Sequence, residues 1–358
     1  MRKTSLHICH LALQAKMAPF AGFEMPIKYI GVVREHHAVR DYAGLFDVSH
    51  MGEFLISGPQ AVPFIQYVFS NDIERLDIGQ AQYGYMPNAK GGIVDDLLVY
   101  RIDQKRYLFV VNAANIEKDW DWLTTHNNMF GATLENRSDQ WSLLALQGPN
   151  ATSILATLTE ANVAKIPFYS FMYGTVAGVD NVLISATGYT GSGGYELYVP
   201  NAHAEKIWNS LIGNGAEPCG LAARNTLRIE MGYCLYGNDI DDSTSPIAAG
   251  LRWCTAFSKD FFSKDIIEQQ KTAGTKTKRV GFVLNERGIP RDGYSLTDFD
   301  GNNIGTVTSG TQSPSLDKGI GMGYIDQKHA VVGNNIYVVI RNKSILATIT
   351  SLPFYSAS

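Results

Sequence analysis

The stretches Arg279-Val280-Gly281-Phe282-Val283-Leu284 and Ile336-Tyr337-Val338-Val339-Ile340 decide how the end of the chain folds. They are short apolar runs, and turn signals such as Asp300-Gly301-Asn302-Asn303 and Gly333-Asn334-Asn335 separate runs of this kind. Short strands with regular turns are typical of a small barrel or sandwich. The sequence therefore predicts an all-β domain from about Arg279 to Tyr355.

The longer region before this tail mixes helix and strand signals. Apolar residues at helical spacing predict helices over residues 59–70, 115–129 and 203–212. Apolar runs bounded by turn residues predict strands over residues 97–102, 107–111, 141–146 and 182–186. The polar stretch 271–278 is the best candidate for a linker to the tail. We therefore expect a chain of the α+β class with more than one domain.

Composition excludes several classes of function. Of the 358 residues, 45% are hydrophobic and 18% are charged, and the net charge is −4. Binding to nucleic acids or anionic membranes requires clusters of basic residues, and this net charge does not indicate such a partner. No apolar run reaches the roughly 20 residues of a membrane-spanning helix. The four cysteines form no C-x-x-C pair, so we expect reduced, buried thiols rather than a metal site or a disulfide framework.

Generic catalytic motifs do not identify the chemistry. The sequence has no G-x-G-x-x-G, G-x-x-x-x-G-K-[ST], H-E-x-x-H or G-x-S-x-G pattern. The glycine-rich segment Gly188–Gly194 lacks the lysine of a phosphate-binding loop. Three histidines are candidates for a functional role: His36, His37 and His50. We expect each of them to be a structural histidine with its hydrogen bonds satisfied.

The first informative cluster is the adjacent carboxylates Asp95 and Asp96, which follow Gly91-Gly92 on an otherwise apolar strand. Successive side chains of a strand point to opposite faces, so one carboxylate is expected to face inward and the other solvent. A buried carboxylate is costly unless it is hydrogen-bonded, and such groups are candidates for acid–base or orienting roles. The alternative is a turn carboxylate after the glycine pair, and the pattern alone does not decide between them.

The second cluster places Tyr189 in the glycine-rich loop and Glu196 shortly after it. Tyr189 offers a stacking face, and Glu196 can accept two hydrogen bonds from one ligand. Together they suit a flat heterocycle with N–H donors, such as a pterin. The alternative is an ordinary glycine-rich hairpin loop.

The third cluster is a predicted helix on which Arg224 and Arg228 are four residues apart, with Glu230 nearby. Arginine is the usual partner of a carboxylate such as the glutamate tail of folate. The alternative is a solvated helix face with salt bridges.

These clusters, in this order, closely resemble the glycine cleavage T-protein family over nearly the whole chain. The other segments that carry the resemblance include Phe20-Ala21-Gly22-Phe23-Glu24-Met25-Pro26, Gly44-Leu45-Phe46-Asp47-Val48-Ser49-His50-Met51-Gly52, Gln147-Gly148-Pro149, Leu235-Tyr236-Gly237 and Thr308-Ser309-Gly310-Thr311-Gln312-Ser313-Pro314. Each segment is weak alone, and the complete ordered set is specific. Asn225 departs from the family pattern, which has aspartate there, and this bears on the orientation of Arg224.

The resemblance implies a catalytic role for Asp96. It also implies a folate pocket formed by Tyr83, Val110, Asn112, Tyr189, Glu196, Arg224 and Tyr233. The implied fold is a three-domain cloverleaf around a central folate channel. Its first domain would comprise residues 1–50 and 138–225 and would hold the folate pocket. Its second domain would comprise residues 51–137 and 226–275 and would carry Asp96. Residues 276–358 would form a C-terminal β-barrel.

The implied activity is that of an aminomethyltransferase with tetrahydrofolate as co-substrate and without a metal or flavin. A lipoylated H-protein would deliver the aminomethyl group, and ammonia and 5,10-methylenetetrahydrofolate would be released. One alternative is a folate-binding iron–sulfur assembly factor on the same fold, but its K-G-C-Y-x-G-Q-E segment is absent. A demethylating flavoenzyme would need a further flavin-binding domain. We expect a cytoplasmic protein, with a mature organellar form as the alternative.

Overall fold

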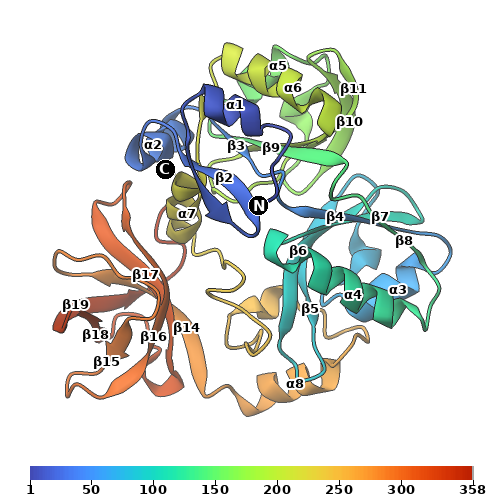
Figure 1. Cartoon of the computed structure of the whole chain (residues 1–358). Helices are drawn as coiled ribbons and strands as arrows, with labels where there is room; N and C mark the ends of the chain where they lie inside the picture. The colour runs from blue at the N-terminus through green and yellow to red at the C-terminus, as the bar shows by residue number, and fades with distance from the viewer. Residues whose placement is uncertain (357–358) are drawn as a thin grey trace. The chain divides into compact units, whose positions relative to one another are not determined.

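The structure of this protein is a computed structural model, and it describes residues 1–356, shown in Figure 1. The chain divides into two compact units. Unit 1 comprises residues 1–84 and 96–224, and unit 2 comprises residues 85–95 and 225–358. The last two residues of the expected barrel domain, 357–358, lie outside the described residues. The three-domain division stays a prediction.

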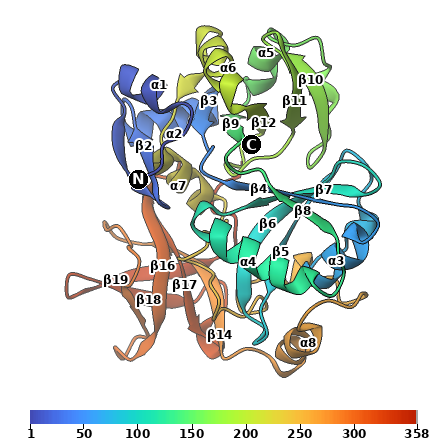
Figure 2. The same cartoon turned by 45° about the vertical axis from the view of Figure 1, so that its right-hand side comes forward.

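Unit 1 contains a six-stranded sheet with the strand order β10-β11-β12-β9-β3-β13. The strands are β3 (Gly44–Asp47), β9 (Trp141–Gln147), β10 (Phe171–Val176), β11 (Val179–Ser185), β12 (Gly194–Pro200) and β13 (Glu217–Pro218). Helices α5 (Ala151–Ala156) and α6 (Asn201–Gly213) cover one face of this sheet, as Figures 1 and 2 show. Leu144, Leu197 and Trp208 are fully buried between these layers.

A five-stranded sheet has the order β5-β6-β7-β4-β8. Its strands are β4 (Gly52–Ser57), β5 (Ala81–Pro87), β6 (Ile93–Arg101), β7 (Arg106–Val111) and β8 (Thr133–Asn136). Helices α3 (Ala61–Val68) and α4 (Ile116–Asn127) belong to the same region. β5 and β6 each run from one unit into the other, because the boundaries fall after Gly84 and Asp95.

The N-terminal segment of unit 1 adds the hairpin of β1 (Lys16–Phe20) and β2 (Phe23–Lys28). Helices α1 (His7–Ala12) and α2 (Val32–Asp41) flank this hairpin in the sequence. The helix α7 (Leu221–Glu230) carries both arginines of the third sequence cluster, and the unit boundary falls directly after Arg224.

A closed barrel ends unit 2, with the order β14-β17-β16-β15-β18-β19. Its strands are β14 (Thr277–Leu284), β15 (Ser295–Thr297), β16 (Asn303–Ser313), β17 (Lys318–Asp326), β18 (Asn335–Ile340) and β19 (Lys343–Thr350). Pairing of β14 with β19 closes the barrel, which removes its sheet edges. Phe282, Leu296 and Val338 fill the interior. The expected C-terminal β-barrel is confirmed.

The predicted linker over residues 271–278 is wrong in most of its length. Helix α8 (Lys264–Ala273) includes its first three residues, and β14 begins at Thr277. Only residues 274–276 lie between the two elements. The polar composition misled the prediction, because a surface helix and the first residues of an exposed strand are as polar as a linker. Ile267 is the one residue of α8 that is buried, so its apolar face is narrow.

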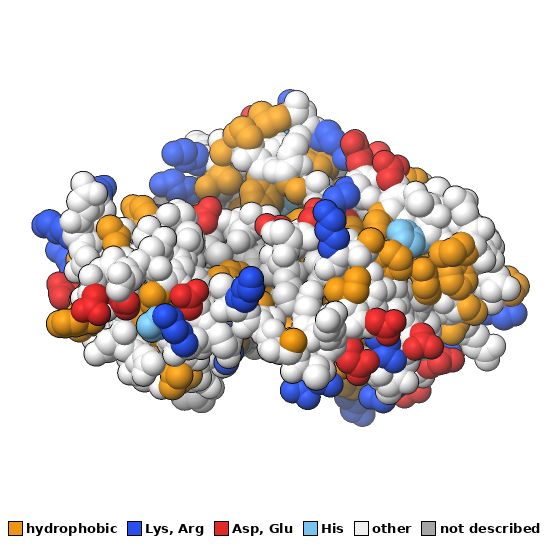
Figure 3. All heavy atoms as spheres, turned by 90° about the horizontal axis from the view of Figure 1, so that it is seen from below, with side chains coloured by type: hydrophobic (Ala, Val, Ile, Leu, Met, Phe, Trp, Pro, Cys, Tyr) orange, Lys and Arg blue, Asp and Glu red, His pale blue; other side chains and the backbone are white. Residues whose placement is uncertain are grey.

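Acidic and basic side chains are interspersed on the face drawn in Figure 3, as expected for a chain with a net charge of −4. Among residues 1–356, no helix is both long and apolar enough to cross a membrane.

Candidate active site

The carboxylate of Asp96 is held on two sides within unit 1. The hydroxyl group of Tyr83, on β5, donates to Asp96 Oδ2 at 2.8 Å. The amide of Asn112 donates to Asp96 Oδ1 at 2.9 Å and to the Asp96 carbonyl oxygen at 3.0 Å. Asp96 itself is only partly buried. The carboxylate is therefore fixed in orientation while part of it stays accessible to a ligand.

The register of the sheet explains why these residues meet. Leu98 on β6 lies opposite Val110 on the antiparallel strand β7, so position 96, two residues before Leu98, and position 112, two residues after Val110, fall on the same face. Four of the predicted site residues lie on the neighbouring strands β5, β6 and β7 or directly after β7: Tyr83, Asp96, Val110 and Asn112. The adjacent carboxylate Asp95 projects to the other face and is fully buried. Reasoning from burial alone would have selected Asp95, and only the family resemblance selected Asp96.

Glu196 lies on β12 with its carboxylate buried. The hydroxyl group of Thr187 donates to Glu196 Oε2 at 2.5 Å. The hydroxyl oxygens of Ser185 and Tyr100 lie 2.9 and 3.2 Å from Thr187 Oγ1, which places Glu196 at the end of a buried hydroxyl network. Burial raises the pKa of Glu196, and the charge of Arg224 and the Thr187 hydrogen bond oppose that rise. The carboxylate keeps acceptor capacity for a ligand that brings N–H donors.

Tyr189 and Arg224 stack on each other. The Arg224 guanidinium lies over the Tyr189 ring, with its Cζ atom 4.8 Å from the ring centroid. Burial lowers the pKa of Arg224, and the nearby Glu196 and Tyr189 oppose that shift. The Arg224 guanidinium therefore covers one face of the Tyr189 ring.

The loop that carries Tyr189 is anchored by Gln147, from the Gln147-Gly148-Pro149 segment. Gln147 Oε1 accepts from the Thr190 hydroxyl at 2.7 Å, and its amide donates to the Thr187 carbonyl at 3.2 Å. A Cβ atom at Gly188 would overlap the amide group of Gln147, so a larger residue there would displace this side chain from its hydrogen bonds. Sequence reasoning noted the glycines but gave Gln147 no role, because its partners are about 40 residues away in the chain.

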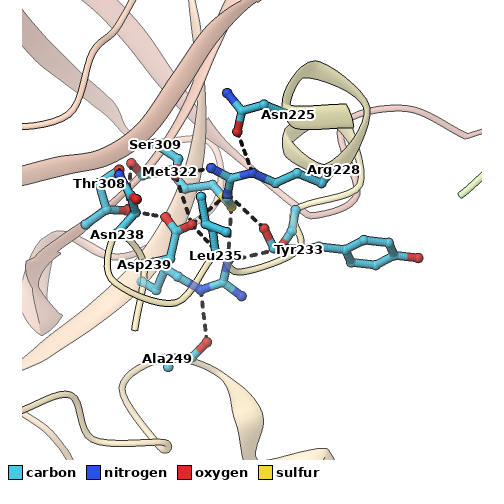
Figure 4. A network of polar contacts seen from close by, with 12 residues as sticks. Asn225, Arg228, Tyr233, Leu235, Asn238, Asp239, Ala249, Thr308, Ser309 and Met322 are labelled. Atoms are coloured by element: carbon cyan, nitrogen blue, oxygen red, sulfur yellow. Dashed lines mark hydrogen bonds and ion pairs between the residues drawn. The ribbon is translucent and has the colours of Figure 1, made fainter. Parts of the chain in front are cut away.

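Arg228 belongs to a buried network in unit 2, drawn in Figure 4. Its Nη1 donates to Asp239 Oδ2 at 2.6 Å and to the Tyr233 carbonyl at 3.0 Å. Its Nη2 donates to the Ser309 hydroxyl at 2.7 Å, and its Nε donates to Asn225 Oδ1 at 2.9 Å. Both charged side chains are almost completely buried. The solvated helix face considered from the sequence is wrong for Arg228, and its guanidinium is committed to structure.

Two further findings follow from this network. Asn225 orients Arg228, whereas the sequence comparison connected it with Arg224. Tyr233, predicted to line the folate pocket, lies in unit 2 and meets Arg228 through its backbone carbonyl.

The segment from Thr308 to Ser313 on β16 binds structural carboxylates. Thr308 and Ser309 donate to Asp239 at 2.5 and 2.9 Å, and Ser313 donates to Glu230 at 2.5 Å. These contacts join the barrel to the end of α7 and the loop after it. The resemblance identified the segment as typical of the family, but its partners could not be read from the sequence.

Cys9, Cys219, Cys234 and Cys254 are all buried and none is in a disulfide, which agrees with the expected buried thiols. Burial raises the pKa of Cys9 and, more strongly, of Cys219, so both are poor nucleophiles near neutral pH. Within residues 1–356, no cluster of three or more histidine, cysteine or acidic side chains is arranged to hold a metal ion.

Comparisons with known proteins show the family to which this chain is similar. Residues 6–259 match the model of the GCVT N-terminal domain, and residues 278–356 match the glycine cleavage T-protein C-terminal barrel domain. Aminomethyltransferases of Flavobacterium psychrophilum and Bacteroides fragilis are 50% and 51% identical over 359 and 360 residues, which is 99% of each chain compared. The crystal structure of the glycine cleavage system aminomethyltransferase T from Bartonella henselae matches with a TM-score of 0.93 at 35% identity, covering 99% of this chain and 98% of that one.

The fold, the two domain matches and the relatives define an enzyme of the transferase class. The chain belongs to the glycine cleavage T-protein family, and the predicted aminomethyltransferase function is confirmed. The α+β fold class is confirmed as well. The iron–sulfur assembly alternative is not favoured, since the relatives that match over the full length are aminomethyltransferases.

Proposed function

We propose that this aminomethyltransferase takes its one-carbon unit from the aminomethyl-dihydrolipoyl arm of an H-protein and transfers it to tetrahydrofolate. The methylene carbon loses its bonds to sulfur and to the amino nitrogen and gains bonds to the two folate nitrogens, N5 and N10. The two protons that leave these nitrogens end on the thiol and on ammonia. The products are the reduced lipoyl arm, ammonia and 5,10-methylenetetrahydrofolate.

The observation that carries this proposal is the fixed carboxylate of Asp96. Tyr83 and Asn112 hold it from two sides, and it remains partly exposed. A carboxylate in this state orients a folate N–H and stabilises positive charge that develops on the attacked carbon. Placing two weak nucleophiles beside one carbon is itself a large source of rate, so the surrounding pocket contributes chiefly by positioning.

The pterin ring is assigned to the wall formed by Tyr189 and Glu196. Glu196 accepts hydrogen bonds from the pterin N–H groups, and Tyr189 stacks against the ring. Arg224 supplies positive charge beside Glu196, and Val110 supplies an apolar contact near Asp96. We include Tyr233 among the proposed folate-binding residues because the family resemblance implies that role.

The burial of all four thiols supports direct transfer from the lipoyl sulfur to folate, without an aminomethyl group bound to the enzyme.

The cytoplasmic location and the cloverleaf arrangement of three domains are part of the same proposal.

A binding and turnover assay tests the proposal. Tetrahydrofolate binding is measured by calorimetry, and product formation is measured with tetrahydrofolate and aminomethylated H-protein. We expect 5,10-methylenetetrahydrofolate and ammonia in equal amounts, and no product when the H-protein lacks its lipoyl group. Folate binding without any turnover in the complete mixture would refute the transferase proposal.

A further inference from the structure

His50 is a buried histidine that the mechanism above does not use. It follows β3 in a turn built by Asp47, whose Oδ1 accepts from the Ser49 backbone N–H at 2.9 Å and from the Ser49 hydroxyl at 2.5 Å. Asp47 Oδ2 is occupied by the Thr4 hydroxyl at 2.7 Å and by His10 Nε2 at 2.9 Å. The Asp47 carboxylate therefore shapes the turn that presents His50 but makes no hydrogen bond to its ring.

The ring of His50 lies among aromatic side chains. The Phe20 and Phe23 rings meet it edge to face, with centroids 5.4 and 6.4 Å away, and His50 is 4% exposed. Burial lowers the pKa of His50 to about 4, the Arg224 charge adds to this, and Asp47 opposes it. The imidazole is thus neutral at pH 7, with one N–H donor and one acceptor nitrogen.

The Nδ1 atom of His50 is buried and has no hydrogen-bond partner among residues 1–356. The expectation of a hydrogen-bonded structural histidine is therefore wrong for this nitrogen. Buried polar groups in folded proteins are almost always satisfied, so an unmatched one needs an explanation, and a bound ligand is one.

Arg224 presents a second unmatched polar atom in the same unit. Its Nη1 is buried and finds no partner within the described part of the chain. The Arg224 charge acts on the pKa of both His50 and Glu196, so it lies within electrostatic reach of each. One acceptor carboxylate and two uncommitted nitrogen groups therefore share one region of unit 1.

We propose that His50 is a further folate-binding residue, and that its Nδ1–H and the Arg224 Nη1–H donate to the carbonyl oxygen of the pterin ring. This inference rests on the proposed function. A pterin carries an amino group and a ring N–H next to that carbonyl, so the donor edge facing Glu196 adjoins an acceptor that needs donors of its own. The neutral imidazole provides one without bringing a second charge beside Arg224.

Substitution of His50 tests the proposal. Phenylalanine keeps a planar ring among Phe20 and Phe23 but has no polar nitrogen, and asparagine places an amide nitrogen near the position of Nδ1. We expect His50→Phe to weaken binding of tetrahydrofolate about tenfold or more and His50→Asn to stay within about threefold of the unaltered protein. His203→Phe, on the exposed side of α6, is the matched control and should bind normally.

A second ligand identifies which part of folate is bound. 6-Methyltetrahydropterin lacks the aminobenzoylglutamate tail, and its affinity should fall by the same factor in His50→Phe. A loss confined to tetrahydrofolate would assign His50 to the tail and overturn the proposal. Unchanged affinity in a folded His50→Phe protein would also overturn it.

The unaltered protein gives a test that does not depend on folding of a variant. With 15N-labelled histidine, saturation with 6-methyltetrahydropterin should shift the Nδ1 resonance of His50 to that of a hydrogen-bonded N–H. An unchanged resonance at saturation would refute the assignment. If the unaltered protein does not bind tetrahydrofolate at all, the proposed function itself fails, and that result is distinguishable from failure at His50 alone.

Discussion

Replacing Asp96 by asparagine should remove most of the activity while leaving the pocket in place. The carboxylate accepts hydrogen bonds from the Tyr83 hydroxyl and the Asn112 amide. An asparagine offers only one acceptor oxygen, so one of these donors would face an amide N–H₂ instead. The substitution would also remove the negative charge that we propose orients the folate nitrogen and stabilises developing positive charge.

The magnitude follows from the role assigned to the carboxylate. General acid–base or electrostatic assistance of this kind typically contributes about 10²–10⁴-fold, which corresponds to roughly 3–5 kcal/mol of transition-state stabilisation. Tetrahydrofolate affinity should change much less, because Glu196 and Tyr189 are untouched. The two donors of Asp96 are partly accessible to water, which also limits the cost in stability.

Single-turnover kinetics with aminomethylated H-protein separate these effects. The rate of product formation at saturating tetrahydrofolate measures the chemical step, and calorimetry gives the folate affinity. Asp95→Asn is the matched control, since that side chain lies on the opposite face of β6. A rate for Asp96→Asn within about threefold of the unaltered enzyme, or a larger loss of turnover per folded molecule for Asp95→Asn, would refute the assignment.

Three further outcomes are expected. Glu196→Ala should weaken tetrahydrofolate binding by about 1–3 kcal/mol with little change in turnover at saturation, because the pterin contacts are alike in ground and transition states. An unchanged calorimetric titration would show that Glu196 does not belong to the pocket. Asp239→Ala should lower the stability of unit 2 by roughly 3–5 kcal/mol in denaturant unfolding, because it leaves Arg228 buried and without its ion-pair partner. The control Asp260→Ala removes an exposed ion pair with Lys264 and should not change the unfolding midpoint. Burial raises the pKa of Glu53 well above 4.5, and neither of its carboxylate oxygens has a partner among the residues described. The contribution of Glu53 to the free energy of unfolding is therefore complete below about pH 4.5, and it is lost as the pH rises through the folded-state pKa. Glu53→Gln should therefore be more stable than the unaltered protein at pH 8, with a gap that closes toward pH 4.5, while the exposed control Glu160→Gln should show no such trend; a gap independent of pH would contradict the raised pKa.

The candidate residues of the site could be proposed from the sequence because they lie in local patterns. The alternation along β6 separated Asp95 from Asp96, and the glycine loop with Tyr189 and Glu196 indicated a flat ligand with N–H donors. The resemblance then selected Asp96 from the pair. What the sequence did not provide was the partner of each polar group, as Gln147, Thr187 and Asp239 illustrate. Hydrogen-bond partners come from segments far apart in the chain, and no local pattern encodes such pairings.

The sequence by itself determined the α+β class, the C-terminal barrel and the family, because strand period, turn residues and ordered motifs are properties of neighbouring residues. The tertiary structure alone decided how the two arginines of α7 differ. Arg228 is neutralised by Asp239 and committed to holding the barrel strand β16, whereas Arg224 stacks on Tyr189 and keeps a buried nitrogen without a partner among residues 1–356. Both arginines have the same chemistry and lie one helical turn apart, so only the burial and charges that surround each one separate the structural Arg228 from Arg224, for which we propose a role in ligand binding.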